Sequence, residues 1–331
     1  MPDGDGLLQG AQARVVGGAG GLADVTDQGG QEGARRARPG ARGADRGVLV
    51  ITTEAPCEVI DVHHHVAEIE GLVGARNTGT RAADPVDARI AYLDAHGIAG
   101  AIISPSSVGV HSTTAPRLND QAAAYRDLAP DRFLAALGTV DPLDVDAALT
   151  EIDRAVTELD VRGFTWHHHF QGTVINDPRM EPLFARLQEH RVPAFVHILA
   201  ESFLEEPWRL QVLADKFPEL DIVALDGFSS GPQAGQMPEL ARRCPNITFD
   251  TGVCISVAHG LDRFIDAVGP ERLVFGSDFY SAPRMFALPF PLYELLNLGL
   301  DTDTLTKVLG GNIRTLLRLG SYEPAVPADV G

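Results

Sequence analysis

From residue 57 onward, short apolar runs rich in Val, Ile, Phe and Ala alternate with amphipathic stretches. The apolar runs predict strands at 58–63, 100–104, 133–140, 161–166, 193–198, 221–226, 247–251 and 273–277. The amphipathic stretches predict helices at 84–96, 118–129, 144–158, 179–190 and 207–217, with closing helices at 289–298 and 302–318. Such alternation indicates a parallel sheet that is covered by helices on its outside.

The number of strand–helix units predicts the fold class. Eight units over about 260 residues match a (β/α)8 TIM barrel, which typically has about 250 residues. We therefore predict an α/β protein whose (β/α)8 barrel spans residues 57–319. A doubly wound open sheet is the alternative, because the pattern shows the units and not their closure.

The two ends of the chain fall outside this pattern. Residues 1–50 hold 13 of the 34 glycines and no aromatic residue, so they cannot bury enough apolar surface to offset the entropy of ordering. We expect residues 1–56 to be a disordered or non-native extension, and residues 320–331 to be a C-terminal tail.

Composition limits the kinds of binding partner and the cellular compartment that we expect. The net charge of -18 disfavours nucleic acid and anionic membranes, and no apolar run approaches the roughly 20 residues of a membrane span. Cys57, Cys244 and Cys254 form no disulfide framework, which favours a cytoplasmic protein. We expect a small-molecule substrate, and the sequence leaves a homo-oligomer open.

Four side chains at the ends of separate predicted strands indicate a metal site. The first strand ends in three histidines, and alternation along a strand places His63 and His65 on one face and His64 on the other. His197 closes the fifth strand and Asp278 closes the eighth. Because strand ends gather at one mouth of a barrel, these side chains should converge there.

The donor types suggest which ion binds. Three imidazoles and one carboxylate suit Zn2+ best, with Mn2+, Fe2+ or Co2+ as alternatives. Such an ion lowers the pKa of bound water toward about 7. Asp278 could both touch the ion and accept the proton of that water.

These motifs resemble the amidohydrolase superfamily. The resemblance lies in Asp61-x-His63-x-His65 after the first strand, in the apolar strand ending in His197, and in Phe275-Gly-Ser-Asp278. It is strongest to the amidohydrolase-related branch that includes aminocarboxymuconate-semialdehyde decarboxylase-like proteins, and it covers residues 57–319. The resemblance implies a barrel of the metallo-dependent hydrolase type with one divalent metal on the four matching positions. It also implies hydrolysis of a C–N or C–O bond, or non-oxidative decarboxylation.

The sixth strand departs from this family. The position where the family commonly has a catalytic His is Asp226 in this chain. An acid can take a proton but cannot act as a cationic donor, so the change weakens the case for a decarboxylase more than that for a hydrolase. Asp226 could also be a structural acid that anchors the following loop.

A second histidine run follows the fourth strand, in Trp166-His167-His168-His169. If the strand continues, His167 and His169 share a face. We expect His167 to contact the substrate or to replace the proton-transfer group missing at Asp226, and Trp166 and His169 to bind substrate. The alternative is a solvated loop.

The residues after Asp278 are candidates for the entrance of the pocket. Phe279, Tyr280 and Arg284 are expected to line this entrance, and Phe279 and Arg284 to contact the substrate, since loops after strands build the pocket in such barrels. Arg284 would suit a carboxylate through a bidentate pair, and a surface ion pair is its alternative role.

Two further motifs are weak. Gly18-x-Gly20-x-x-Ala23 has the spacing of a dinucleotide-binding loop but lacks a sufficient strand before it. Gly227-Phe-Ser229-Ser-Gly231 fits a nucleophile elbow, but the last histidine, His259, precedes Asp278, so the usual triad order fails.

The sequence therefore favours a metal-dependent hydrolase of an amide, lactone or ester, with Asp278 as the base and His167 or Asp226 steering the substrate. The alternative is a non-oxidative decarboxylase that uses the same metal site. From another class, a catalytically inactive barrel that binds a small molecule remains open because of Asp226.

Overall fold

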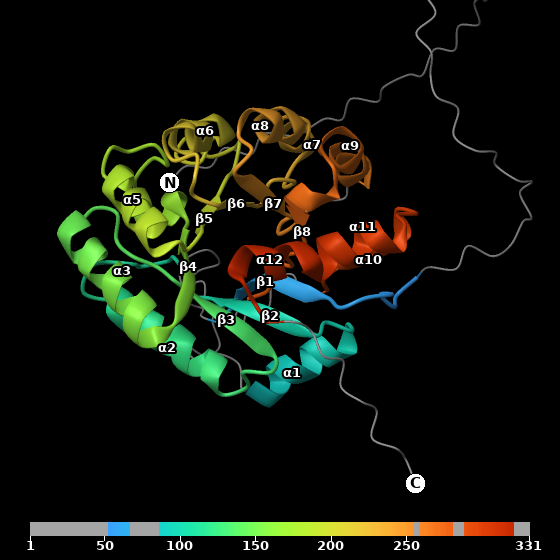
Figure 1. Cartoon of the computed structure of the whole chain (residues 1–331), viewed down its shortest axis with the longest axis horizontal. Helices are drawn as coiled ribbons and strands as arrows, with labels where there is room; N and C mark the ends of the chain where they lie inside the picture. The colour runs from blue at the N-terminus through green and yellow to red at the C-terminus, as the bar shows by residue number, and fades with distance from the viewer. Residues whose placement is uncertain (1–51, 67–85, 255–257, 281–287, 321–331) are drawn as a thin grey trace, which may run out of the picture. The chain divides into compact units, whose positions relative to one another are not determined.

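Eight parallel strands form one sheet in which each strand pairs with the next in sequence order (Figure 1). The computed structural model describes residues 52–66, 86–254, 258–280 and 288–320. The strands are β1 (Ile60–His65), β2 (Gly100–Ser104), β3 (Phe133–Gly138), β4 (Val161–Trp166), β5 (Ala194–His197), β6 (Ile222–Leu225), β7 (Ile247–Asp250) and β8 (Leu273–Val274).

The segment that follows β8 closes the ring onto β1. Val62 N–H donates to the Phe275 carbonyl at 3.0 Å, and His65 N–H donates to the Phe279 carbonyl at 2.8 Å. His64 and Phe279 also form a parallel bridge. The first and last strands of an open doubly wound sheet do not join in this way, so the predicted (β/α)8 barrel is confirmed and the open sheet is excluded.

Helices cover the outside of the ring (Figure 1). They begin at the predicted places or close to them; for example, Asp144 accepts a hydrogen bond from Ala147 N–H at the start of α3. The longer helices are α1 (Val86–Ala95), α2 (Ala115–Asp127), α3 (Val145–Leu159), α5 (Met180–His190), α6 (Pro207–Lys216), α8 (Met237–Arg243), α9 (Ala258–Val268) and α10 (Phe290–Asn297). The shorter ones are α4 (His168–Gln171), α7 (Gly231–Ala234), α11 (Thr302–Thr306) and α12 (Asn312–Leu317), and a π-helical stretch over Lys307–Gly311 joins the last two.

Two apolar clusters hold the barrel together. The larger cluster lies between the strands and the surrounding helices. The smaller one, which we call the inner core, fills the inside of the ring and includes side chains from α12. Its members are Ile60, Val62, Ile102, Ala135, Leu137, Phe195, Val223, Leu225, Val274, Ile313 and Leu317.

A β-bulge in β1 connects the inner core to the histidines. Asp61 pairs with Ala101 and His64 pairs with Ile103, so β1 has one residue more than β2 between these two pairs. An extra residue reverses the side to which the following side chains point. Val62 therefore joins the inner core, and the neighbouring His63 also points inside the ring.

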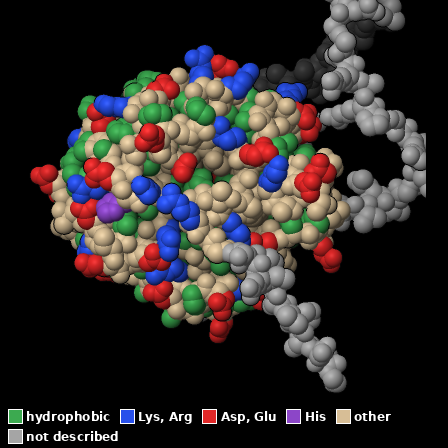
Figure 2. Space-filling model, in the orientation of Figure 1, with side chains coloured by type: hydrophobic (Ala, Val, Ile, Leu, Met, Phe, Trp, Pro, Cys, Tyr) green, Lys and Arg blue, Asp and Glu red, His purple; other side chains and the backbone are tan. Residues whose placement is uncertain are grey.

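The outer surface carries mixed charge. Acidic and basic side chains are interspersed on the face drawn in Figure 2. Ion pairs among the described residues include Arg132–Asp94 and Arg154–Asp120. None of the helices in the described residues is both long and apolar enough to cross a membrane.

Candidate metal centre

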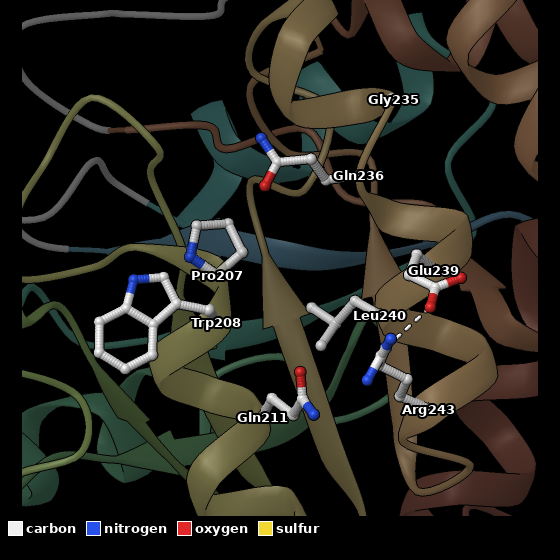
Figure 3. A pocket seen from close by; sticks show the side chains of 8 residues that line it. All are labelled: Pro207, Trp208, Gln211, Gly235, Gln236, Glu239, Leu240 and Arg243. Atoms are coloured by element: carbon white, nitrogen blue, oxygen red, sulfur yellow. Dashed lines mark hydrogen bonds and ion pairs between the residues drawn. The ribbon is translucent and has the colours of Figure 1, made fainter.

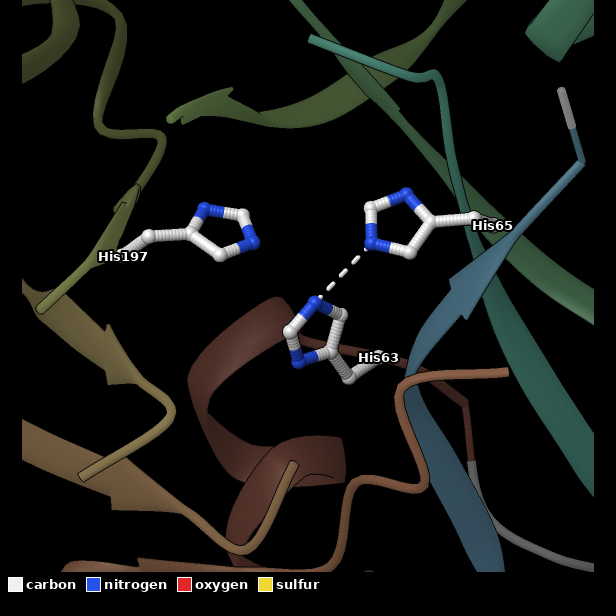
Figure 4. Close-up of side chains that lie close together, drawn as sticks. All are labelled: His63, His65 and His197. Carbon is white, nitrogen blue, oxygen red and sulfur yellow. Dashed lines mark hydrogen bonds between the residues drawn. The ribbon is translucent and has the colours of Figure 1, made fainter. Parts of the chain in front are cut away.

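Three imidazoles meet inside one mouth of the barrel. His63 and His65 come from β1 and His197 from the end of β5, and all three rings point toward one common space (Figure 4). The Nε2 atoms of His63 and His65 lie 3.0 Å apart, and the ring centroids of His63 and His197 lie 5.1 Å apart. Each of the three residues offers a ligand atom within 4.8 Å of the others, and all three side chains are buried.

The Nδ1 atom of each imidazole faces an oxygen acceptor outside this space. The acceptors are Asp250 Oδ2 for His63 at 2.8 Å, the Pro105 carbonyl for His65 at 3.4 Å and the Trp166 carbonyl for His197 at 2.8 Å. An Nδ1–H that donates to such an acceptor leaves the Nε2 lone pair available, which is the usual arrangement of histidines that bind a metal.

Asp278 supplies a carboxylate to the same space. It follows β8 with a left-handed φ of 56°, and its Oδ1 lies 3.2 Å from His63 Nε2 and 3.4 Å from His65 Nε2. Among the described residues, neither Asp278 Oδ1 nor His197 Nε2 has a hydrogen-bond partner, although both atoms are buried. Unpartnered buried donors and acceptors are costly, and a cation between them would satisfy both. The residues therefore fit a divalent metal ion.

The carboxylates around His63 make its environment strongly negative. Burial alone would lower the pKa of His63, but Asp278, Asp250 and Asp226 outweigh it and raise this pKa to about 10. Burial holds the pKa of His65 below its ordinary value and that of His197 well below it. Without a cation His63 is therefore protonated at neutral pH, and a metal ion would displace that proton.

Asp226, the acid at the position of the family's strand-six His, lies at this centre. It directly follows β6 with a left-handed φ of 64° and is 3% exposed. Its N–H donates to Asp250 Oδ1 at 2.7 Å, and its Oδ1 accepts from Val253 N–H at 3.2 Å. Burial first, and the charge of Asp278 second, raise the pKa of Asp226 well above its ordinary value.

Two glycines allow the carboxylates to approach His63. A Cβ at Gly252 would lie 2.5 Å from Asp226 Oδ1 and 2.6 Å from His63 Nδ1. A Cβ at Gly276 would lie 2.5 Å from Asp250 Oδ2 and 2.8 Å from His63 Cβ. Any side chain at either position would have to displace these polar groups.

The second histidine run differs from the prediction. Strand β4 ends at Trp166, and His168 and His169 lie on the short helix α4, so the condition for His167 and His169 to share a strand face is not met. His167 nevertheless reaches the metal centre, since its ring stacks on His197 with centroids 4.2 Å apart. Its Nδ1 lies 2.6 Å from Oε1 of the buried Glu205, which also accepts from His169 N–H.

Two predicted substrate contacts, Trp166 and Phe279, need correction, and a third, Arg284, cannot be checked. The Trp166 ring points to the helix side of β4 and packs against Phe184 in the larger apolar cluster. Only the Trp166 carbonyl contacts the centre, where it faces His197 Nδ1. The Phe279 ring packs outside β1, stacked on His64, because it points away from the side that Asp278 occupies. Neither ring is placed to bind substrate at the centre, and Arg284 lies outside the described residues.

Tyr280, expected at the entrance of the pocket, stacks on His65 with centroids 4.1 Å apart. Two residues at the centre were missed from sequence. Asp250 ends β7, the same kind of strand-end position that singled out the other residues. Glu205 lies in the connection between β5 and α6, where no sequence pattern distinguishes it.

A separate hollow lies in the outer layer of helices. It is formed between α6 and α8 (Figure 3). Pro207, Trp208 and Gln211 line it from α6. No metal-ligating cluster among the described residues includes its lining, so the chemistry concentrates at the barrel mouth.

The family model described as amidohydrolase matches residues 60–319, and the chain therefore belongs to the amidohydrolase family. This match confirms the resemblance drawn from the sequence motifs. With the His and Asp centre at the barrel mouth, it defines a metal-dependent enzyme of the amidohydrolase superfamily that carries a divalent-metal site.

Several of the similar proteins are named as decarboxylases. Over 133 residues the chain is 33% identical to a gamma-resorcylate decarboxylase of Rhizobium radiobacter, and the match covers 35% of this chain and 40% of that relative. The chain thus matches less than half the length of this curated relative.

Two solved structures share the fold. A 5-carboxyvanillate decarboxylase from Novosphingobium aromaticivorans, complexed with manganese and 4-hydroxy-3-methoxy-5-nitrobenzoic acid, has a TM-score of 0.65 and 19% identity, covering 82% of this chain and 100% of that chain. A 2,6-dihydroxybenzoate decarboxylase complexed with 2,6-dihydroxybenzoate has a TM-score of 0.62 and 19% identity, covering 79% of this chain and 99% of that chain.

These comparisons correct the predicted activity. The expectation that the chain is primarily a hydrolase is wrong, because the named relatives are decarboxylases of aromatic acids. The alternative, a non-oxidative decarboxylase, agrees with them better. The preference for Zn2+ is not confirmed, since the related structure with a named metal holds manganese.

Proposed function

We propose that this chain is a metal-dependent, non-oxidative decarboxylase of a small aromatic carboxylic acid that carries a hydroxyl group. The observation that carries the proposal is the convergence of three buried imidazoles and Asp278, whose Oδ1 has no hydrogen-bond partner among the described residues, in a chain similar to gamma-resorcylate decarboxylase. The proposed metal ligands are His63, His65, His197 and Asp278.

The reaction breaks the bond between a ring carbon and the carboxylate carbon. The electron pair of this bond stays on the ring, carbon dioxide leaves, and a proton takes its place on the ring carbon. A bound divalent cation supplies positive charge that orients an anionic substrate and stabilises negative charge as it develops. The protein must hold that cation, position the ring and deliver the proton.

His167 is the side chain best suited to deliver the proton. Its ring stacks on His197 beside the centre, and its Nδ1 is held by Glu205 at 2.6 Å, so Nε2 is the atom that can reach a substrate. A carboxylate that holds the far nitrogen of an imidazole fixes its tautomer and orientation. His167 therefore takes the role that the family's strand-six His would have.

Tyr280 restricts access of water to the centre. Its ring covers one face of His65 with an interplanar angle of 14°, and it is 6% exposed. Because a decarboxylation needs no attacking water, covering the centre in this way suits the proposed reaction.

The test uses the full chain loaded with Mn2+ and given 2,6-dihydroxybenzoate, 5-carboxyvanillate and a panel of other hydroxylated aromatic acids. We expect carbon dioxide release in step with the decarboxylated product, and one deuterium on the ring when the reaction runs in D2O. The His63→Ala variant is the control. If metal-loaded protein releases carbon dioxide from no acid of the panel, the proposal fails.

A further inference from the structure

Asp226 lies closer to the metal centre than a structural acid requires. Its Oδ1 is 3.7 Å from His63 Nδ1, while the hydrogen bond that anchors the following loop, from Val253 N–H, uses only that one oxygen. Among the described residues no hydrogen bond involves Asp226 Oδ2. One carboxylate oxygen therefore remains available.

Asp226 forms a second cluster of ligand atoms that overlaps the first. His63, Asp226 and Asp278 each offer one ligand atom, and these atoms lie within 4.8 Å of one another. His63 belongs both to this cluster and to the cluster of three histidines. Asp278 Oδ1, buried and without a hydrogen-bond partner among the described residues, lies near His63 and His65 alike. The two clusters thus meet at His63, with Asp278 beside both of the β1 histidines.

The local charge favours a cation beside His63. Three buried carboxylates, of Asp226, Asp250 and Asp278, surround one imidazole. Only Asp250 is well satisfied, because it accepts from the Asp226 N–H and faces His63 Nδ1. Buried carboxylates this close repel one another unless a proton or a cation lies between them.

We propose that Asp226 is a fifth protein ligand of the divalent ion, an inference that rests on the metal centre of the proposed function. The four other ligands are His63, His65, His197 and Asp278. Five protein ligands exceed the four of a tetrahedral zinc site and suit a six-coordinate ion such as Mn2+. One position then remains for an oxygen of the substrate.

The substitution Asp226→Asn separates this role from a structural one. Asn keeps the volume and the oxygen that accepts from Val253 N–H, so a loop anchored by Asp226 stays anchored. The substitution removes the negative charge that the carboxylate would place beside the ion. A variant of a buried acid at the same mouth, Glu205→Gln, is the matched control, because Glu205 faces His167 and belongs to neither ligand cluster among the described residues.

The experiment measures binding of Mn2+, Co2+ and Zn2+ to the metal-free full chain by calorimetric titration, and the visible spectrum of the Co2+ form. For Asp226→Asn we expect Mn2+ binding to weaken about 10-fold or more, with a smaller loss for Zn2+. We also expect stronger Co2+ absorption, because the coordination number falls. Glu205→Gln should retain the wild-type values.

Thermal unfolding of the metal-free proteins gives a second readout. Removing the charge of one of the facing carboxylates should raise the melting temperature of metal-free Asp226→Asn, whereas a purely structural acid, whose loop contact Asn keeps, would leave it unchanged. Unchanged Mn2+ affinity and an unchanged Co2+ spectrum in Asp226→Asn, or two bound ions per wild-type chain, would overturn the inference while the proposed function stands. A wild-type chain that binds none of the three metals would remove both.

Discussion

The inner core and the metal centre are built on the same ring of strands but differ in what keeps them buried. The inner core consists of aliphatic side chains and Phe195, which need only close packing. The metal centre, one residue further along β1, buries three imidazoles and several carboxylates. Buried charge is tolerated only when it is paired or binds a cation. The β-bulge between Asp61 and His64 lies where the apolar inner core ends and the polar metal centre begins.

This comparison teaches that the two regions should respond differently to substitution. A change in the inner core should alter the free energy of unfolding and leave the chemistry intact. A change in the metal centre should alter metal binding and turnover with little loss of stability in the metal-free protein.

The largest effect is expected for His63→Ala and Asp278→Asn. Each removes a proposed ligand, so decarboxylation should fall by about 1,000-fold or more, equivalent to about 4 kcal/mol of transition-state stabilisation. Metal content, measured by elemental analysis after dialysis, should fall with it. Equal metal in both variants and the wild type would mean that the ion, if any, binds elsewhere.

In the inner core, Ile313→Ala should lower the free energy of unfolding by about 2–5 kcal/mol, because it leaves a cavity beneath the strands. Denaturant unfolding measures this loss. The milder Ile313→Val should cost about 0.5–1.5 kcal/mol. Metal content and kcat at low temperature should match the wild type in both, and loss of metal would show that the two regions are not separable.

Within the mouth but outside the ligand set, His167→Gln should lower kcat by about 100-fold, the smaller end of what a proton-transfer group contributes. Metal affinity should stay unchanged, because the proposed ligands are intact. A variant that turns over at the wild-type rate would assign the proton transfer to another group.

The smallest effect is expected for Asp250→Asn, which weakens the hold on His63 Nδ1 without removing a proposed ligand. Metal affinity should fall by about 10–100-fold, the usual range for residues that orient a metal-binding histidine. A competition titration with a chelator measures it. If affinity falls as far as in His63→Ala, Asp250 is itself a ligand.

The barrel and the convergence of the four predicted ligand residues could be predicted from sequence because both follow from strand periodicity. His63, His65, His197 and Asp278 stand at strand ends, and a closed ring brings strand ends together whatever lies between them in sequence. The β-bulge did not disturb the prediction, since it precedes His63 and leaves the alternation between His63 and His65 intact.

Side-chain direction beyond the strand ends could not be predicted in the same way. Trp166 lies at the end of β4, where its ring points to α5, and Phe279 lies beyond β8, where its ring points to α1. Helix α4 begins just after β4, so side chains no longer alternate between two faces by the time the chain reaches His169. The reaction type could not be predicted either, because the family resemblance implies the same metal-ligand positions for hydrolases and for decarboxylases.

The glycines at 252 and 276 have a consequence for how this centre could change. Neither can bind the ion, yet each sets how near an acid comes to His63. A single added methyl group at either place would spread the negative groups apart and weaken the hold on a cation. Substitution of either glycine should therefore change cation binding at the mouth of the barrel, although neither residue has a reactive side chain.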